Sequence, residues 1–315
     1  MDKYGLPCNQ YQKVMTTGFA GGYDFYEKMR RMMKKQKDIR ISKEVIYAKN
    51  HKIPLLVLRP DNQTEKRAGV LWIHGGGYFL GMKEMVYMSR ALDLVRKFGV
   101  TVISPGYRLA CIKPYPAAIQ DCYQVLLYMK KHAGRLGIRD DQIFVGGESA
   151  GGGLAAALCM LARDKETVKI AYQMPLYPML DNYDTASSKN NHGRVWNTRR
   201  NHFGWRMYLR SKAKKEVSPY AAPARQKDYS GLPPAYTFVG NGEPFFEETK
   251  AYIHNLKAAG IPAKLDIYDM DMHAFDMLKP DLEVSRIAAQ KFNEEFAYAM
   301  EHYYTQIRGQ VHAHV

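Results

Sequence analysis

The residues Gly147-Glu148-Ser149-Ala150-Gly151 decide the fold of this chain, because they spell G-x-S-x-G between an expected strand and an expected helix. An apolar run at residues 143–145 precedes the motif, and a helix-favouring run at residues 154–161 follows it. A serine on such a sharp turn is held in a strained conformation with its hydroxyl exposed. Glycines flank it because the two backbones pass close together there. Alone, the motif is also compatible with an ordinary strand-to-helix turn.

A second glycine-rich stretch, His74-Gly75-Gly76-Gly77, ends the apolar run at residues 70–73. Acyl transfer requires backbone N–H groups aimed at the oxygen that becomes negative in the tetrahedral intermediate. Consecutive glycines suit that task because no side chain blocks the approach of the backbone to a ligand. Alone, the run is more typical of a flexible loop, but the two motifs in this order favour an acyl-transfer site.

Length and composition indicate a globular chain with a sizeable core. The chain has 315 residues, and its 46% of hydrophobic residues is ordinary for a globular protein. No run of about 18 apolar residues is present, so we expect no transmembrane helix. Residues 1–5 lack the apolar core of a signal peptide. We therefore expect a cytoplasmic protein without stable membrane association.

The spacing of cysteine and histidine predicts neither disulfides nor a metal site. The cysteines show no C-x-x-C spacing, and we expect free thiols in a reducing compartment. They are Cys8, Cys111, Cys122 and Cys159. His312 and His314 are better interpreted as part of a frayed tail than as metal ligands.

The net charge of +15 at pH 7 is concentrated in residues 21–45 and 185–215. The second segment holds nine Lys or Arg residues and no Asp or Glu. Basic segments attract nucleic acid, an anionic membrane or an anionic substrate, but a solvated basic face is the interpretation we favour. No recognised nucleic-acid motif accompanies them, so we expect no nucleic-acid partner.

Strand-like and helix-like runs alternate along the chain, which predicts an α/β fold. Residues 22–37 favour an amphipathic helix, and residues 43–58 favour two strands around residues 50–52. Further strands are expected at residues 69–73, 100–104, 141–146, 169–174, 235–240 and 263–268. Helices are expected at residues 84–98, 116–132, 150–163, 245–259 and 281–304. This alternation predicts a mainly parallel sheet with an active site at the carboxyl ends of its strands.

Residues 181–224 interrupt the alternation, because they contain no clear strand. Insertions this long in a compact α/β domain are usually functional, and this one could cap the active site. It carries Trp196, Phe203, Trp205, Met207 and Tyr208. Lining of a substrate pocket and packing in a helical core are both open for these side chains.

Ser149 needs a base beside it, because a serine hydroxyl is a weak nucleophile by itself. In this chain order, an acid and then a histidine are expected to follow the serine. His273 is the best candidate, since it follows the last expected strand. His254 lies in an expected helix and is a surface candidate, whereas His192 and His202 belong to the insertion.

The acid is expected in the loop after the strand at residues 235–240, where Glu243 follows. A carboxylate there would orient the imidazole and stabilise the imidazolium. Glu247 and Glu248 fall in the next helix, and we expect them to be surface charges. Three aspartates near the histidine remain alternatives: Asp266, Asp269 and Asp271.

Over about residues 43–300 these motifs resemble the hormone-sensitive-lipase family of α/β-hydrolases, in its bacterial esterase branch. Besides the two glycine motifs, the resemblance rests on further segments that match the family's pattern along the chain. They are Tyr107-Arg108-Leu109-Ala110, Pro116-Ala117-Ala118, Asp121, Ser218-Pro219, Ala222-Pro223, Gly231-Leu232-Pro233-Pro234-Ala235, Glu243-Pro244-Phe245-Phe246-Glu247-Glu248, Ala251-Tyr252 and His273-Ala274-Phe275.

The chain departs from the family pattern in its acid segment and after the tyrosine-arginine segment. Glu243 stands where Asp is usual, and Phe246-Glu247 stands where R-D is usual. Cys111-Ile112 stands where Pro-Glu is common, which concerns packing more than chemistry. A Glu is one methylene longer than an Asp, so the geometry of the acid is the feature that this departure puts in question.

The resemblance implies the α/β-hydrolase fold, with a mostly parallel central sheet flanked by helices and a helical cap. The core would comprise residues 43–180 and 218–315, and the cap would comprise residues 1–42 and 181–217. Catalysis would fall to Ser149 as nucleophile, Glu243 as acid and His273 as general base. The oxyanion amides would come from Gly76, Gly77 and Ala150, and His74 would buttress the glycine loop.

The expected function is a serine carboxylic-ester hydrolase that acts on short- to medium-chain acyl esters, including aryl and acetyl esters. Its partner is a small-molecule ester, and the reaction requires no metal or organic cofactor. Two alternatives stay open: a non-catalytic small-molecule-binding protein on the same fold, and an amidase or deacetylase. Dimerisation through a sheet edge is common among proteins of this kind, so a homodimer is a further expectation.

Overall fold

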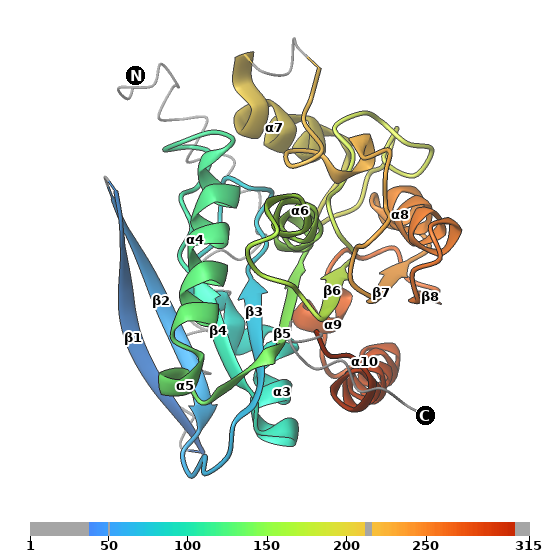
Figure 1. Cartoon of the computed structure of the whole chain (residues 1–315). Coiled ribbons are helices and arrows are strands. Elements are labelled where there is room, and N and C mark those ends of the chain that lie inside the picture. Colours follow the sequence, from blue (N-terminus) through green and yellow to red (C-terminus); the bar gives the residue numbers. More distant parts are fainter. Residues whose placement is uncertain (1–37, 50, 212–215, 306–315) are drawn as a thin grey trace, which may run out of the picture.

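One sheet of eight strands forms the centre of the part of the chain that the computed structural model describes, residues 38–49, 51–211 and 216–305 (Figure 1). The strands are β1 (Ile39–Ala48), β2 (His51–Pro60), β3 (Arg67–Ile73), β4 (Thr101–Pro105), β5 (Ile138–Glu148), β6 (Tyr172–Leu176), β7 (Ala235–Gly240) and β8 (Ala263–Tyr268). Their order across the sheet is β1-β2-β4-β3-β5-β6-β7-β8.

The sheet is parallel from β4 through β8, whereas β1 and β2 are antiparallel to each other and β2 is antiparallel to β4. The predicted mostly parallel sheet is confirmed, and β7 and β8 have the predicted bounds. The first hairpin is longer than predicted, because its pairing extends to Ile39 opposite Pro60. Residues 39–42 therefore belong to β1, and the predicted boundary between cap and core at residue 42 falls inside this strand.

Helices cover both faces of the sheet (Figure 1). They are η1 (Lys83–Met88), α3 (Ala91–Phe98), α4 (Ala117–Lys131), α5 (Ala133–Leu136), α6 (Ala150–Lys165), α7 (Thr198–Leu209), η3 (Pro223–Arg225), α8 (Phe246–Ala258), α9 (Phe275–Leu278) and α10 (Glu283–His302). Successive residues of a strand point to opposite faces. Leu71 and Ile73 of β3 accordingly pack with α4, α6 and α8, whereas Val70 and Trp72 pack with α3 and α10.

The helix predicted at residues 84–98 is interrupted and forms two elements, η1 and α3. Ser89 lies at the break, where its hydroxyl donates to the Val86 carbonyl and accepts the Ala91 N–H at 3.1 Å. A serine hydroxyl that bonds the local backbone in this way competes with the helical pattern. The apolar residues of the run do recur at helical spacing, as predicted, but Ser89 divides the run into two helical elements.

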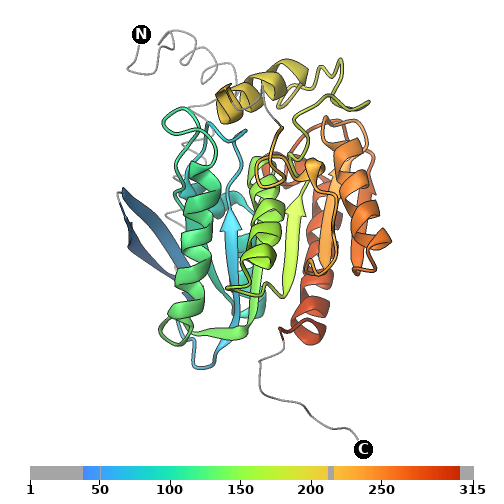
Figure 2. The same ribbon diagram turned by 45° about the horizontal axis from the view of Figure 1, so that its top comes forward.

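Helix α7 lies across the carboxyl ends of the strands, as Figures 1 and 2 show. Asn197 caps its N-terminus by accepting the Arg200 N–H. Tyr208 stacks on Tyr78 with ring centroids 4.1 Å apart, and Trp205 packs against the same ring. These side chains of the insertion are therefore core residues. The helix predicted at residues 22–37 lies outside the described residues, as does the predicted cap segment up to residue 37.

Candidate active site

Ser149 lies between β5 and α6 on a turn with strained backbone, at φ 58° and ψ −123°. Its N–H donates to the Leu176 carbonyl at 3.0 Å, which ties the turn to β6. Gly151 is required at this turn, because a Cβ there would stand 2.0 Å from the Ile73 carbonyl oxygen. The G-x-S-x-G motif thus has the local geometry that its sequence predicts, with the helix and β3 in close approach.

Ser149, His273 and Glu243 form one hydrogen-bonded chain at the carboxyl edge of the sheet. The Ser149 hydroxyl donates to Nε2 of His273 at 2.9 Å. Nδ1–H of the same ring donates to the Glu243 carboxylate. The three side chains lie 124 and 30 residues apart in sequence, yet they are 7%, 5% and 1% exposed as residues and meet in one place.

The imidazole of His273 is held by rings as well as by the carboxylate. Tyr177 and Phe245 pack edge-on against it, with centroid distances of 5.2 and 5.0 Å. Burial raises the pKa of Glu243, and the adjacent His273 acts in the opposite direction. The second carboxylate oxygen, Oε1, is buried and has no hydrogen-bond partner among the described residues. A single oxygen of Glu243 therefore orients the histidine.

Two of the three alternative acids, Asp266 and Asp269, bond other side chains, and two of the alternative histidines have other positions. Asp266 accepts the Tyr236 hydroxyl, and Asp269 accepts the side-chain amide of Asn241. His254 is exposed on α8, as predicted. His202 pairs with Asp184 at 2.7 Å in the insertion. None of these contacts competes for His273.

Glu248 was expected at the surface, and this expectation is wrong. The residue is only 3% exposed, and its Oε1 accepts the Leu180 N–H at 2.6 Å. Burial raises its pKa well above the usual range. Because Leu180 directly precedes the insertion, and the Asp181 N–H also donates to the same oxygen, Glu248 ties the start of the insertion to α8. Helical periodicity alone did not reveal this inward orientation.

The glycine loop lies directly beside Ser149. Gly76 and Gly77 have φ values of 112° and 59°, in the region that favours glycine, and the Gly76 carbonyl accepts the N–H groups of Phe79 and Leu80. Ala150 begins α6, and the first N–H groups of a helix have no partner within it. The amides predicted to bind an oxyanion thus stand around the serine, and their role stays a prediction.

His74 is buried beneath the glycine loop. Its Nδ1–H donates to the Gly75 carbonyl at 2.8 Å, and its ring stacks on Tyr107 with centroids 4.2 Å apart. The Tyr107 hydroxyl donates to the His74 carbonyl. Burial lowers the pKa of His74 to about 4, so the ring is neutral at pH 7. This geometry suits a buttress for the loop better than a proton-transfer group.

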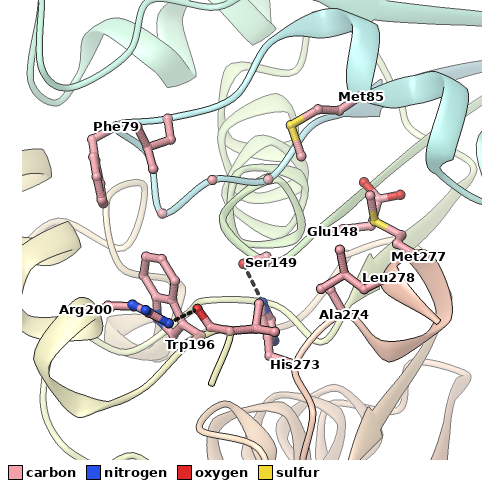
Figure 3. A pocket seen from close by; sticks show the side chains of 15 residues that line it. Phe79, Met85, Glu148, Ser149, Trp196, Arg200, His273, Ala274, Met277 and Leu278 are labelled. Carbon is pink, nitrogen blue, oxygen red and sulfur yellow. Dashed lines mark hydrogen bonds between the residues drawn. The ribbon is translucent and has the colours of Figure 1, made fainter. Parts of the chain in front are cut away.

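A largely apolar cavity opens at Ser149 (Figure 3). Its side-chain lining comes from the residues after the glycines of the glycine loop, from η1, the end of β5, the insertion and the segment after His273. These residues are Phe79, Leu80, Met85, Glu148, Val195, Trp196, Arg200, Ala274, Met277 and Leu278. Sequence reasoning left Trp196 open as a pocket residue, and it does line the cavity. It missed Arg200, Met85 and Met277, because no local pattern shows which helix faces turn inward.

Glu148, the residue before the serine, belongs to a buried polar network that sequence reasoning also missed. Nε1–H of Trp72 donates to its Oε1 at 2.8 Å. Nearby, Asp276 accepts the Tyr177 hydroxyl at 2.8 Å and pairs with Arg90 at 3.3 Å. Burial, and secondarily the Asp276 charge, raise the pKa of Glu148 to about 8. Glu148 is therefore mostly protonated at pH 7.

Within residues 38–49, 51–211 and 216–305, no group of three or more His, Cys, Asp or Glu side chains is arranged to hold a metal ion. In the same ranges, no helix combines the length and the apolar character needed to cross a bilayer.

Comparisons with known proteins agree with this geometry. Residues 70–277 match a family model described as alpha/beta hydrolase fold. An arylesterase of Saccharolobus solfataricus is 31% identical over 234 residues, which cover 73% of this chain and 75% of that protein.

Solved structures give the same picture over more of the chain. The structure of a bacterial heroin esterase superposes with a TM-score of 0.82 at 29% identity and covers 89% of this chain and 92% of its own. The esterase LipW of Mycobacterium marinum superposes with a TM-score of 0.83 at 27% identity and covers 93% and 91%.

Proposed function

The chain belongs to the alpha/beta hydrolase fold family, in the esterase branch that resembles hormone-sensitive lipase, and we propose that it cleaves carboxylic esters with Ser149 as its nucleophile. It is an ester hydrolase of the carboxylesterase type. The observation that carries the assignment of residues is the hydrogen-bonded chain from Ser149 through His273 to Glu243, which opens onto an apolar cavity.

In the first half of the reaction, Ser149 Oγ attacks the ester carbonyl while Nε2 of His273 accepts its proton. Glu243 stabilises the imidazolium that forms. The amides of Gly76, Gly77 and Ala150 stabilise the negative oxygen of the tetrahedral intermediate, and one such donor is typically worth about 10²–10³ in rate. His273 then protonates the departing alcohol, which leaves the acyl group on Ser149.

In the second half, a water molecule takes the place of the alcohol. His273 removes its proton, the hydroxide attacks the acyl-enzyme, and the second tetrahedral intermediate collapses to the carboxylic acid. The Ser149 hydroxyl regains its proton from the imidazolium. No step needs a metal or an organic cofactor.

We propose short- to medium-chain acyl esters as substrates, since the cavity is apolar but closely framed by large side chains. Phe79, Trp196 and Met85 stand around Ser149, and Trp196 leaves so little room that a Cβ on Gly77 would lie 2.2 Å from its ring. A series of 4-nitrophenyl esters from acetate to dodecanoate tests this proposal, and kcat/KM is expected to peak before the longest chains.

The assignment of Ser149 is tested with the Ser149→Ala variant and the Ser230→Ala control. Ser230 is an exposed serine in a turn, so its loss is expected to leave turnover of 4-nitrophenyl acetate unchanged. The Ser149→Ala variant is expected to lose turnover by at least about 10³-fold. Retention of wild-type turnover by this variant would contradict the assignment.

Covalent labelling separates the esterase from a non-catalytic binding protein on the same fold. An organophosphate is expected to modify wild-type protein once, at Ser149, and to leave the Ser149→Ala variant unmodified. A binding protein without an activated serine would bind a small ester but would not be labelled.

We further propose that the enzyme acts on small esters without a nucleic-acid partner, in the cytoplasm. Buried free thiols at Cys122 and Cys159 support a reducing compartment. A homodimer is proposed because β8 is an edge strand of the described sheet, and edge strands carry unpaired backbone groups. Light scattering at several protein concentrations measures its mass.

A further inference from the structure

Glu148 gives the apolar side of the cavity a hydrogen-bonding group. Figure 3 shows its carboxyl on the side of Ser149 that lies away from Trp196. The lining residues near it carry aliphatic or thioether side chains: Met85, Ala274, Met277 and Leu278. The proposed mechanism of ester cleavage makes no use of this carboxyl. A buried acid that lines a substrate cavity without a task in the chemistry is a candidate for substrate recognition.

Trp72 fixes the orientation of this carboxyl. Its Nε1–H donates to Oε1 of Glu148 at 2.8 Å, and the two residues are 0% and 3% exposed. The contact joins β3 to the end of β5, where Ile73 lies opposite Gly147. Because Oε1 accepts this N–H, Oε2 is the oxygen that carries the proton when the acid is neutral. The bond to one oxygen therefore holds the O–H of the other in a defined direction.

The surroundings of Glu148 favour its neutral form. Asp276 is fully buried nearby, where it accepts the Tyr177 hydroxyl at 2.8 Å and pairs with Arg90 at 3.3 Å. Arg90 also pairs with Asp93 at 3.2 Å, so two carboxylates share its charge. Burial first and the Asp276 charge second raise the pKa of Glu148 to about 8, against weaker opposing hydrogen bonds and the Arg90 charge. At pH 7 the carboxyl therefore has an O–H to donate.

An O–H donor in apolar surroundings discriminates between substrates. An alkyl chain placed against Glu148 would exclude water from the O–H and give it no acceptor, which costs more than a hydrogen bond gains. A substrate with an oxygen acceptor at that point avoids this cost. A site with a buried hydrogen-bonding group therefore rejects a ligand that lacks the matching group. An anionic acceptor is disfavoured here, because the Asp276 charge is nearby.

We propose that Glu148 is a specificity-determining residue, which donates a hydrogen bond to a neutral oxygen acceptor of the substrate while Ser149 attacks the ester carbonyl. The preferred substrates are then small esters that carry a second oxygen function, an ether or a carbonyl. This function lies close to the scissile bond, because Glu148 and Ser149 are consecutive residues. The apolar remainder of the molecule lies toward Met277 and Leu278. The inference rests on the proposed ester hydrolysis and adds a substrate class to it.

Two pairs of isosteric esters test the inference, and in each pair an ether oxygen replaces one methylene group. On the alcohol side, 2-methoxyethyl acetate is compared with butyl acetate. On the acyl side, ethyl 4-methoxybutanoate is compared with ethyl hexanoate. The measured quantity is the ether preference, defined as kcat/KM of the ether ester divided by kcat/KM of its alkyl partner. Intrinsic differences between the two esters of a pair cancel when this preference is compared between variants.

Three variants separate the hydrogen bond from the shape of the cavity. Glu148→Met removes the donor at similar volume, and it is expected to lower the ether preference about tenfold for at least one pair. Glu148→Gln keeps an N–H donor at the same place and should stay within about threefold of the wild-type preference. Met277→Leu is the matched control, since it changes an apolar lining residue and removes no donor, and it should also keep the preference.

The wild-type protein provides a second measurement, which decides the matter even where Glu148→Met does not fold because Trp72 has lost its acceptor. Ionisation removes the O–H of Glu148, so the ether preference of the wild type should fall between pH 7 and pH 9.5. In Glu148→Gln it should stay level. Both esters of a pair depend on the same Ser149 and His273, so the titration of these groups cancels in the ratio.

An ether preference that is unchanged in Glu148→Met for both pairs would overturn the inference. So would a wild-type preference that is the same at pH 7 and pH 9.5, or one that falls equally in Glu148→Gln. The failure of the proposed function has a different signature: no cleavage of 4-nitrophenyl acetate and no labelling by an organophosphate. Cleavage of all four esters with a preference that does not depend on Glu148 contradicts the substrate class alone.

Discussion

Replacement of Glu243 by Gln is expected to remove catalysis and leave the fold intact. The carboxylate accepts the Nδ1 proton of His273 through one oxygen, while its other oxygen is buried without a described partner. In Glu243→Gln, the amide can donate to Nδ1, and the ring proton then moves to Nε2. That nitrogen faces the Ser149 hydroxyl at 2.9 Å and can no longer accept its proton.

The expected loss in kcat is about 10⁴-fold, the size found when the acid of a serine–histidine–acid triad becomes its amide. This corresponds to about 5.5 kcal/mol in the activation barrier, at 1.36 kcal/mol for each factor of ten. Stability should respond differently. Burial raises the pKa of Glu243, so the folded protein holds its proton more tightly than the unfolded chain does. The ionised group therefore costs stability as pH rises above the unfolded pKa, and a neutral amide avoids this cost.

The assay measures turnover of 4-nitrophenyl acetate together with the melting temperature at pH 6, 7 and 8. Glu247→Gln is the matched control, since Glu247 pairs with Lys250 at 3.0 Å on the half-exposed side of α8 and should lose less than twofold in activity. Activity of Glu243→Gln within tenfold of wild type would refute the reasoning. A melting temperature that falls together with activity would show that the Glu243 carboxylate stabilises the fold and that its role is not confined to orienting His273.

The remaining predictions concern two other residues that line the cavity. Glu148 has a folded pKa of about 8, above its usual range, so its ionisation makes stability fall as pH rises between about 5 and 8, by up to about 1.4 kcal/mol per pH unit. Urea unfolding of Glu148→Gln should lack this component, and parallel pH profiles of variant and wild type would contradict it. Trp196→Ala removes a ring that packs between Phe79 and Phe245 beside the cavity. Its kcat/KM ratio for 4-nitrophenyl octanoate over acetate should rise severalfold, and an unchanged ratio would mean that Trp196 does not limit the substrate.

Much of the fold could be predicted from local patterns. The runs that became β7 and β8 have the predicted bounds, because buried parallel strands are short, apolar and bounded by turn residues. The order of serine, acid and histidine was also readable, since each stands at the end of such a strand. Parallel strands bring their carboxyl ends to one edge, so residues far apart in sequence are expected to meet there. Ser149, Glu243 and His273 do so.

The tertiary structure alone decided which side chains turn inward from helices and loops. In the sequence, Glu248 resembles an ordinary surface charge on a helix. In the structure, it is buried and accepts the backbone N–H of Leu180. Glu148 was only the variable position of a motif, until Trp72 from another strand proved to donate to it. Arg200 was one of nine cations in a basic segment.

The place of Arg200 in the cavity depends on how α7 packs over the carboxyl ends of the strands. The sequence by itself determined the sheet, the strand ends and the candidate nucleophile, base and acid, because short-range periodicity and turn chemistry encode them. The charge and shape of the cavity were settled by packing between segments distant in the chain, for which no local pattern exists.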